Sequence, residues 1–213
     1  MCECRRAFVV STSAGVAKLL RALAGAMEEQ QVPWYLFGAQ AAIVWGSPRY
    51  SADVDITVSL DREALPSFIA ALQSHGFALV FDDAEFIEQT RVIPFRHRPT
   101  RIRLDVVLLG PGLEEDFLAR ALDIEVKGKT IPVISPEDLL ILKTLAGRAK
   151  DIEDIKGVLG ARRATLDVER VRTILRMLEK ALDQGDLLPV FEKAWEATSD
   201  PEILLTSKRK KKP

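Results

Sequence analysis

The stretch FGAQAAIVWGSPRYSADVDITV, from Phe37 to Val58, places two aspartates inside an otherwise apolar pattern. Residues 34–38 form a short aromatic and apolar run that predicts a strand. Residues 39–46 are rich in alanine and end at Gly46, which predicts a short helix. Residues 52–60 alternate in polarity and are rich in β-branched side chains, which predicts a second strand. The two aspartates, Asp53 and Asp55, fall on that second strand.

A strand directs successive side chains to opposite faces, so Asp53 and Asp55 share one face. Val54, Ile56 and Val58 share the other face. Two carboxylates about 5 Å apart repel by roughly 3 kcal/mol at an effective dielectric constant near 20. A fold keeps such a pair where an Arg or Lys partner, a shared proton or a divalent metal offsets the repulsion. The residues by themselves leave these three alternatives open.

A third carboxylate favours the metal. Residues 101–110, RIRLDVVLLG, predict a strong strand on which Arg101, Arg103 and Asp105 share one face. If this strand neighbours the strand of Asp53, three carboxylates converge. Aspartates on adjacent strands can hold two metal ions for in-line phosphoryl transfer, and Mg²⁺ prefers such oxygen ligands together with substrate phosphates.

Gly38 precedes the predicted helix at the end of the predicted strand. A glycine at this place lets the backbone approach a ligand closely. The free N–H groups at the start of a helix can bind phosphate oxygens.

Taken together, these residues resemble the nucleotidyltransferase superfamily with the DNA polymerase β-like fold. Its pattern is a strand, a Gly followed by Gly or Ser, then Asp-x-Asp, with a third acid on a later strand; here Gly38-Ala39, Asp53-Val54-Asp55 and Asp105 match it. Residues 35–56 look especially similar to small bacterial members related to the AbiEii toxin and to the minimal nucleotidyltransferases. Arg49 matches an Arg common before the Asp pair in that group, and residues 135–155 resemble its helical segment, with matches at Lys143, Arg148, Lys150, Asp151 and Asp154.

The resemblance implies a reaction and a set of roles. Asp53, Asp55 and Asp105 would bind Mg²⁺ (or Mn²⁺), and Asp105 would help to deprotonate the attacking hydroxyl. The amides of Gly38 and Ala39, with Arg49 and Lys143, would bind the nucleotide. A nucleoside monophosphate would pass from an NTP such as ATP to RNA (tRNA included) or to a protein, with release of pyrophosphate. A cognate toxin or antitoxin would be a further partner.

Ala39 departs from the pattern, because Gly or Ser is usual at that position. The departure keeps a second hypothesis open, in which the chain is a nucleotide-binding antitoxin or scaffold of the same fold with weakened catalysis. A third hypothesis is a metal-dependent phosphohydrolase that uses the same acids.

The stretch RVIPFRHRPTRIR, residues 91–103, gathers five arginines that are candidates for contact with RNA or a triphosphate. Its first part, residues 91–95, predicts a strand that Pro94 would place at a sheet edge. Trp45 is a candidate platform for stacking a base. Lys143 either extends to solvent or reaches the nucleotide, and Asp151 and Asp154 are expected to pair with Arg148 and Lys150.

The fold class that we predict is α+β: a mixed β-sheet nucleotidyltransferase core with flanking helices over residues 1–134, then a helical region packed on the core over 135–200. Residues 201–213 form a basic tail that ends in SKRKKKP, and without the five cations of those last seven residues the chain carries a charge of −1 − 5 = −6. No apolar run approaches the ~18 residues of a membrane span. Cys2 and Cys4 cannot build a disulfide framework. We therefore expect a cytoplasmic protein without a membrane partner.

Overall fold

The computed structural model describes residues 13–51, 53–81 and 83–198, and the chain divides into two compact units. Unit 1 comprises Met1–Ala41 and Tyr50–Ser135, and unit 2 comprises Ala42–Arg49 and Pro136–Pro213. The predicted basic tail and both cysteines lie outside the described residues. Within the described residues, no helix is long and apolar enough to cross a membrane.

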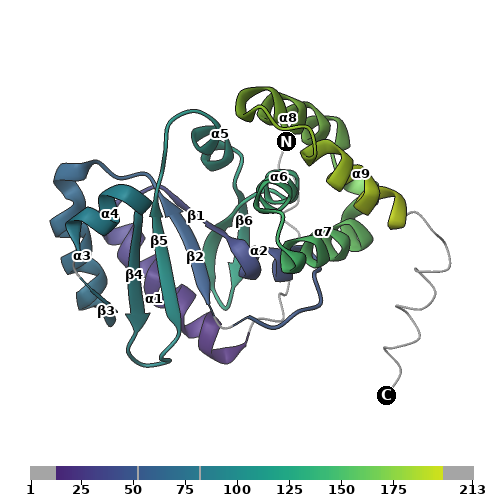
Figure 1. Ribbon diagram of the computed structural model, residues 1–213. Helices are drawn as coiled ribbons and strands as arrows, with labels where there is room; N and C mark the ends of the chain where they lie inside the picture. Colours follow the sequence, from purple (N-terminus) through teal and green to yellow (C-terminus); the bar gives the residue numbers. More distant parts are fainter. Residues whose placement is uncertain (1–12, 52, 82, 199–213) are drawn as a thin grey trace, which may run out of the picture. The chain divides into compact units, whose positions relative to one another are not determined.

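Unit 1 is built on a seven-stranded sheet (Figure 1). Its strands are β1 (Trp34–Phe37), β2 (Val54–Val58), β3 (Phe77–Leu79), β4 (Val92–His97), β5 (Arg103–Leu108), β6 (Leu122–Val126) and β7 (Lys129–Val133), in the order β3-β4-β5-β2-β1-β7-β6. β2 pairs with β5 in parallel and β1 with β7 in parallel, and the other neighbours are antiparallel. The sheet is mixed, so the α+β prediction is confirmed.

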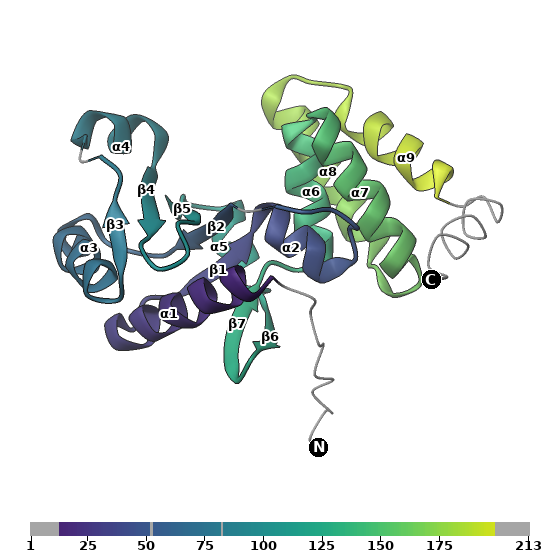
Figure 2. The same cartoon turned by 90° about the horizontal axis from the view of Figure 1, so that it is seen from below.

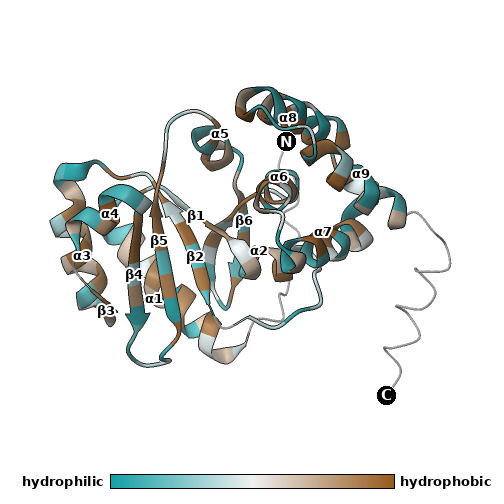
Figure 3. Ribbon diagram, in the orientation of Figure 1, coloured by the Kyte–Doolittle hydropathy of each residue, from teal (hydrophilic) through white to brown (hydrophobic). Residues whose placement is uncertain are grey.

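Four helices and one 3₁₀ turn accompany this sheet: α1 (Ala14–Gln30), the 3₁₀ turn Arg62–Ala64, α3 (Leu65–Ser74), α4 (Ala84–Thr90) and α5 (Leu113–Ala119). α1 passes behind β4, β5 and β2 in Figure 1 and lies to one side of the strands in Figure 2. Ser13 caps it by accepting a hydrogen bond from the Val16 amide. The buried residues of α1 recur at spacings of three and four, among them Val16, Leu19 and Leu23, as expected for an amphipathic helix on a sheet. Figure 3 shows hydrophobic residues along β4, β5 and β2.

Pro94 does not lie on an edge strand, so that prediction is wrong: β4 has neighbours on both sides, β3 and β5. The Pro94 carbonyl accepts from the Val80 amide, just beyond the last residue of β3. The N–H and C=O of one residue point to the same side of a strand, so the missing N–H of Pro94 would face Val80, just beyond the last residue of β3. The proline therefore costs at most one hydrogen bond, at the end of β3.

Unit 2 is helical. α2 (Gly38–Trp45) starts in unit 1 and ends in unit 2, where it is joined by α6 (Pro136–Ala146), α7 (Ala149–Arg162), the 3₁₀ turn Arg163–Thr165, α8 (Val168–Leu182) and α9 (Leu187–Ala197). Within the unit, α6 contacts α7, α8 and α9. Gly46 and Gly157 let the segment after α2 approach α7 closely, because a Cβ on Gly157 would lie 2.7 Å from Cα of Ser47.

Candidate active site

Asp55 and Asp105 lie side by side on neighbouring strands of unit 1. They are direct partners in the parallel register of β2 and β5, and adjacent strands are spaced by about 4.8 Å. Both side chains are half-buried, while their strand neighbours Val54, Leu104 and Val106 are buried on the other face. The structure therefore brings together two of the three carboxylates on which the sequence prediction depends.

Gly38 lies against the carboxylate of Asp55. The backbone of Gly38 is left-handed, with φ of +67°, and a Cβ at this position would overlap Oδ2 and lie 2.8 Å from Cγ of Asp55. Phe37, one residue earlier, is the register partner of Asp55 across β1 and β2. Only glycine allows the backbone at the start of α2 to lie this close to the acid.

Asp53 is exposed and lies just before β2. Its backbone is held by Gln40 of α2, whose Nε2 donates to the carbonyl oxygens of Ser51 at 2.8 Å and Asp53 at 3.2 Å. Sequence reasoning gave Gln40 no role, although it is a buried polar residue. It fixes the path of the chain that leads to the two aspartates.

Arg103, one of the five arginines that the sequence suggests for contact with RNA or a triphosphate, forms an ion pair with Asp105. Its Nε donates to Oδ1 of Asp105 at 2.8 Å, with the Arg103 side chain 53% exposed and the Asp105 side chain 21% exposed. The hydrogen bond and the charge of Asp105 raise the pKa of Arg103, and the charges of Asp53 and Asp55 add to this effect. All three carboxylates are thus within electrostatic reach of one guanidinium group. Arg103 and Asp105 share a strand face at a spacing of two, and this pattern could have indicated the pair.

The donor chemistry of this cluster fits a divalent cation. It offers hard carboxylate oxygens with a glycine backbone against one of them, as Mg²⁺ sites in phosphoryl transfer require. Among the residues that the structure describes, no three His, Cys, Asp or Glu side chains are already gathered as a metal-binding group.

Gly38 and Ala39 are the first two residues of α2. The first N–H groups of a helix have no partner inside the helix, and the macrodipole makes this end attractive to anions. Ala39 retains its backbone N–H even though a serine hydroxyl is absent. Phosphate binding by these amides stays a prediction.

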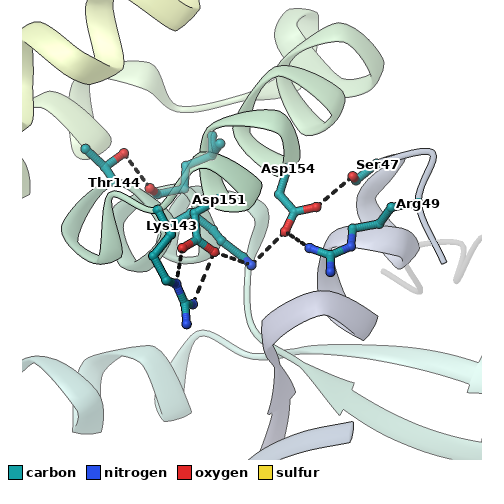
Figure 4. A network of polar contacts seen from close by, with 8 residues as sticks. Ser47, Arg49, Lys143, Thr144, Asp151 and Asp154 are labelled. Atoms are coloured by element: carbon teal, nitrogen blue, oxygen red, sulfur yellow. Dashed lines mark hydrogen bonds and ion pairs between the residues drawn. The ribbon is translucent and has the colours of Figure 1, made fainter. Parts of the chain in front are cut away.

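Lys143 lies in unit 2, in a network of buried charges (Figure 4). Its Nζ is 2.9 Å from Oδ1 of Asp151 and 2.7 Å from Oδ2 of Asp154, and its side chain is only 9% exposed. Asp151 also accepts from Nε of Arg148 at 2.5 Å. Burial would raise the pKa of Asp151, but the hydrogen bonds from Arg148 and Lys143 and their charges outweigh it and hold that pKa below its usual value.

Arg49 belongs to the same network. Its Nη1 is 2.8 Å from Oδ2 of Asp154, and the Ser47 hydroxyl donates to Oδ1 of Asp154 at 2.9 Å. Asp154 is therefore bridged to the segment after α2 and to α6. The predicted partners of Asp151 and Asp154 were Arg148 and Lys150. Arg148 does pair with Asp151, but Lys143 and Arg49 supply the other ion pairs. Among the described residues, no ion pair joins Lys150 to either aspartate. These contacts favour a structural role, and nucleotide binding by Lys143 and Arg49 stays a prediction.

Trp45 does not offer a stacking face. It is 3% exposed, and the guanidinium of Arg162 lies 5.2 Å from its ring centre. The expectation of a base-stacking platform at Trp45 is wrong because α2 directs this ring into the interior of unit 2.

Comparison with known proteins places this geometry in context. Residues 108–184 match a family described as a nucleotidyl transferase of unknown function. Among solved structures, the antibiotic-resistance factor ANT(2'')-Ia superposes with a TM-score of 0.57 at 17% identity, covering 81% of this chain and 97% of that chain. This chain and ANT(2'')-Ia share one fold. The chain has a nucleotidyltransferase fold.

Two further solved structures agree. A nucleotidyltransferase-like protein from Paracoccidioides brasiliensis has a TM-score of 0.57 at 17% identity, covering 87% of this chain and 94% of that one. ANT(2'')-Ia in complex with adenylyl-2''-tobramycin has a TM-score of 0.52 at 15% identity, covering 84% and 98%. A search of curated proteins finds no match. The family match covers residues 108–184, and the solved structures share the fold of this chain. A specific relation to AbiEii stays a prediction.

Proposed function

We propose that the chain transfers a nucleoside monophosphate from an NTP to a hydroxyl group of an RNA or protein acceptor, with release of pyrophosphate. One observation carries the proposal: Asp55 and Asp105 are register partners on adjacent parallel strands, with the backbone of Gly38 against the Asp55 carboxylate. This places two oxygen ligands beside the start of a helix, where a triphosphate can bind.

In this proposal each residue has a stated task. Asp53 and Asp55 bind the divalent cation that accompanies the triphosphate, and the amides of Gly38 and Ala39 donate hydrogen bonds to its outer phosphates. Asp105 helps to take the proton from the attacking hydroxyl, so that the oxygen attacks the α-phosphorus while the bond to the leaving pyrophosphate breaks. A bound Mg²⁺ or Mn²⁺ would neutralise charge that develops on the phosphate oxygens.

Arg103 has a second part in this scheme. Its ion pair with Asp105 has an exposed guanidinium, and exposed ion pairs contribute only about 0–1 kcal/mol. A divalent cation or a phosphate can therefore displace this contact at small cost. Arg103 then remains near the three carboxylates and can donate to a phosphate oxygen.

The test is incubation of the full chain with α-labelled NTPs, Mg²⁺ and separate acceptors: total RNA, cell protein and tobramycin. Tobramycin is included because ANT(2'')-Ia was solved with its adenylylated product. We expect label on RNA or protein, and a loss of about 100-fold or more in Asp55→Asn and Asp105→Asn, the scale for removal of an electrostatic group from an active site. Asp123→Asn is the matched control, since Asp123 is exposed on β6 of the same unit.

The same assay separates the alternatives. Nucleotide binding without label transfer to any acceptor supports the binding-module hypothesis, which Ala39 and the Arg103–Asp105 pair keep open. Phosphate release without a labelled adduct supports the phosphohydrolase. Label on tobramycin alone would overturn the proposed acceptor class. A place in a toxin–antitoxin pair follows if expression of the active chain arrests growth and a neighbouring gene relieves the arrest.

A further inference from the structure

A basic hollow of about 500 Å³ lies in unit 1, apart from the carboxylate cluster. It is lined by α1 and by the turn and following strand of the β6–β7 hairpin. Four of its seven lining residues are cations and the other three are alanines: Lys18, Arg21, Lys127, Lys129, Ala14, Ala17 and Ala22. Among the residues that the structure describes, no acidic side chain and no aromatic ring lines it.

The charge of this hollow is largely uncompensated. Lys129 pairs with Glu28 at 2.7 Å, but Lys18, Arg21 and Lys127 are exposed and form no ion pair with any residue that the structure describes. The pKa of the nearby His97 is lowered, first by burial and then by the charge of Lys18.

The β4–β5 turn lies next to the first turn of α1 and adds two cations near the hollow. Gly15 of α1 faces this turn, since a Cβ there would lie 3.2 Å from Cδ1 of Ile102. The turn carries Arg98 and Arg101, both exposed, and it is fixed by the Arg101 amide, which donates to the His97 carbonyl at 2.7 Å. We call the set Lys18, Arg21, Lys127, Lys129, Arg98 and Arg101 the basic strip.

Two cations of the basic strip occupy backbone positions that normally favour other residues. Arg101 has φ of +61° and Lys127 has φ of +46°. Lys127 and Gly128 form the two-residue turn between β6 and β7, where Asn-Gly or Gly-Gly fits with less strain. Strain of this kind is typical of functional positions, where the side chain matters more than the backbone cost.

The chemistry of the strip selects one kind of ligand. Six cations spread over α1 and two turns exceed what a single phosphate needs and match a chain of phosphates. Among the described residues no aromatic ring lines the hollow on which a base could stack, and its cations match the phosphate backbone that every sequence shares.

We propose that the basic strip binds the phosphodiester backbone of a polynucleotide without regard to its base sequence. The binding itself does not depend on catalysis. It deepens the proposed function in one respect, since it makes the acceptor a polynucleotide, and that step rests on the proposed function.

The test is binding of the full chain to a fluorescent 20-nucleotide RNA, measured by anisotropy over a salt series. The strip variant is Lys18→Gln, Arg21→Gln and Lys127→Asn, in which asparagine suits the left-handed backbone. The control variant is Lys156→Gln, Lys180→Gln and Lys193→Gln, which removes three exposed cations from unit 2. Both variants lose the same charge.

We expect the strip variant to bind about tenfold more weakly and to reduce the slope of log K against log salt by about 2, at about 0.7 for each lost phosphate contact with a single strand. The control should stay within twofold. A DNA of the same sequence distinguishes the source of the backbone; binding of either polymer supports the proposal.

Three results would overturn it: equal losses in the strip and control variants, loss only when the five tail cations are replaced by serine, or equal binding of poly-glutamate. Asp55→Asn separates this proposal from the catalytic one, because it should abolish label transfer and leave RNA binding unchanged. If Asp55→Asn abolishes label transfer but the strip variant binds RNA as tightly as the native chain, only the proposal about the basic strip is refuted.

Discussion

At the scale of single residues, the contact of Gly38 with Asp55 limits what the candidate site can tolerate. The left-handed backbone costs about 1–2 kcal/mol for any residue with a Cβ, and at Gly38 the Cβ would also overlap a carboxylate oxygen. The cost therefore has two sources, one general and one specific to this place.

We predict that Gly38→Ala lowers the free energy of unfolding by about 2–4 kcal/mol, from backbone strain plus overpacking, and abolishes nucleotide transfer. The control is Gly76→Ala, which has φ of +86° but only ordinary contacts around its Cβ, the nearest at 3.8 Å. Urea unfolding and the transfer assay measure both. Equal destabilisation by the two variants would show that the contact with Asp55 adds nothing.

At the scale of elements, buried charges connect α6, α7 and the segment after α2 within unit 2. Asp154 is fully buried and accepts from Lys143, Arg49 and Ser47. Removal of one partner from such a network leaves a buried charge uncompensated. Glu153 is its neighbour on the same helix, but its side chain is 73% exposed and pairs with Lys156 at the surface.

We predict that Asp154→Ala destabilises the protein by about 3–5 kcal/mol, whereas Glu153→Ala costs about 0.5 kcal/mol or less. Thermal and urea unfolding of the two variants give the comparison. If Asp154→Ala were as mild as Glu153→Ala, solvent would have to reach Lys143.

The lowered pKa of Asp151 predicts a dependence on pH. A carboxyl group whose pKa is lower in the folded state stabilises the protein above its unfolded pKa of about 3.9 and loses this effect as pH falls through the folded pKa. The stability difference between the native chain and Asp151→Asn should be complete at pH 7 and should shrink below about pH 4. Unfolding in urea at both pH values measures it. A constant difference would contradict the assigned ion pairs.

Two glycines of α7 provide an opposite pair of predictions. A Cβ on Gly157 would meet Cα of Ser47, whereas a Cβ on Gly160 would meet nothing within 4 Å. Gly160→Ala should stabilise the protein by about 0.5–1 kcal/mol through helix propensity. Gly157→Ala should destabilise it by about 1–3 kcal/mol through overpacking. Melting temperatures test the signs; stabilisation by both changes would mean that the segment after α2 yields easily.

Sequence reasoning located most of these elements because their patterns are local. Alternation predicted β2 and β5, and the shared face of Asp55 and Asp105 followed once those strands were neighbours. The helix α4 starts where Asp83 caps it by accepting from the Phe86 amide. The partners of Lys143 and Arg49 could not be predicted, since they depend on which helices pack together. Pro94 led to the wrong prediction of an edge strand, because the effect of a proline on a sheet depends on where the neighbouring strand ends, here β3.

At the scale of the whole molecule, we predict that folding does not depend on metal. Arg103 already offsets the charge of Asp105, so EDTA should leave the melting temperature unchanged while it abolishes nucleotide transfer. An NTP with Mg²⁺ at 100 times its Kd should add about 2.7 kcal/mol, a rise of roughly 5–10 °C for a chain of this size. Strong destabilisation by EDTA alone would show that a metal also holds the fold together.

The division into two units has a consequence for inheritance. The chain crosses from one unit to the other at Ala41–Ala42, Arg49–Tyr50 and Ser135–Pro136, and the first crossing lies inside helix α2. No single break in the gene separates the two. Recombination that exchanged only the 3′ end of the gene would keep Ala42–Arg49, eight residues of the original unit 2, beside a unit 2 from another protein. The two units therefore stay intact only when they are inherited together.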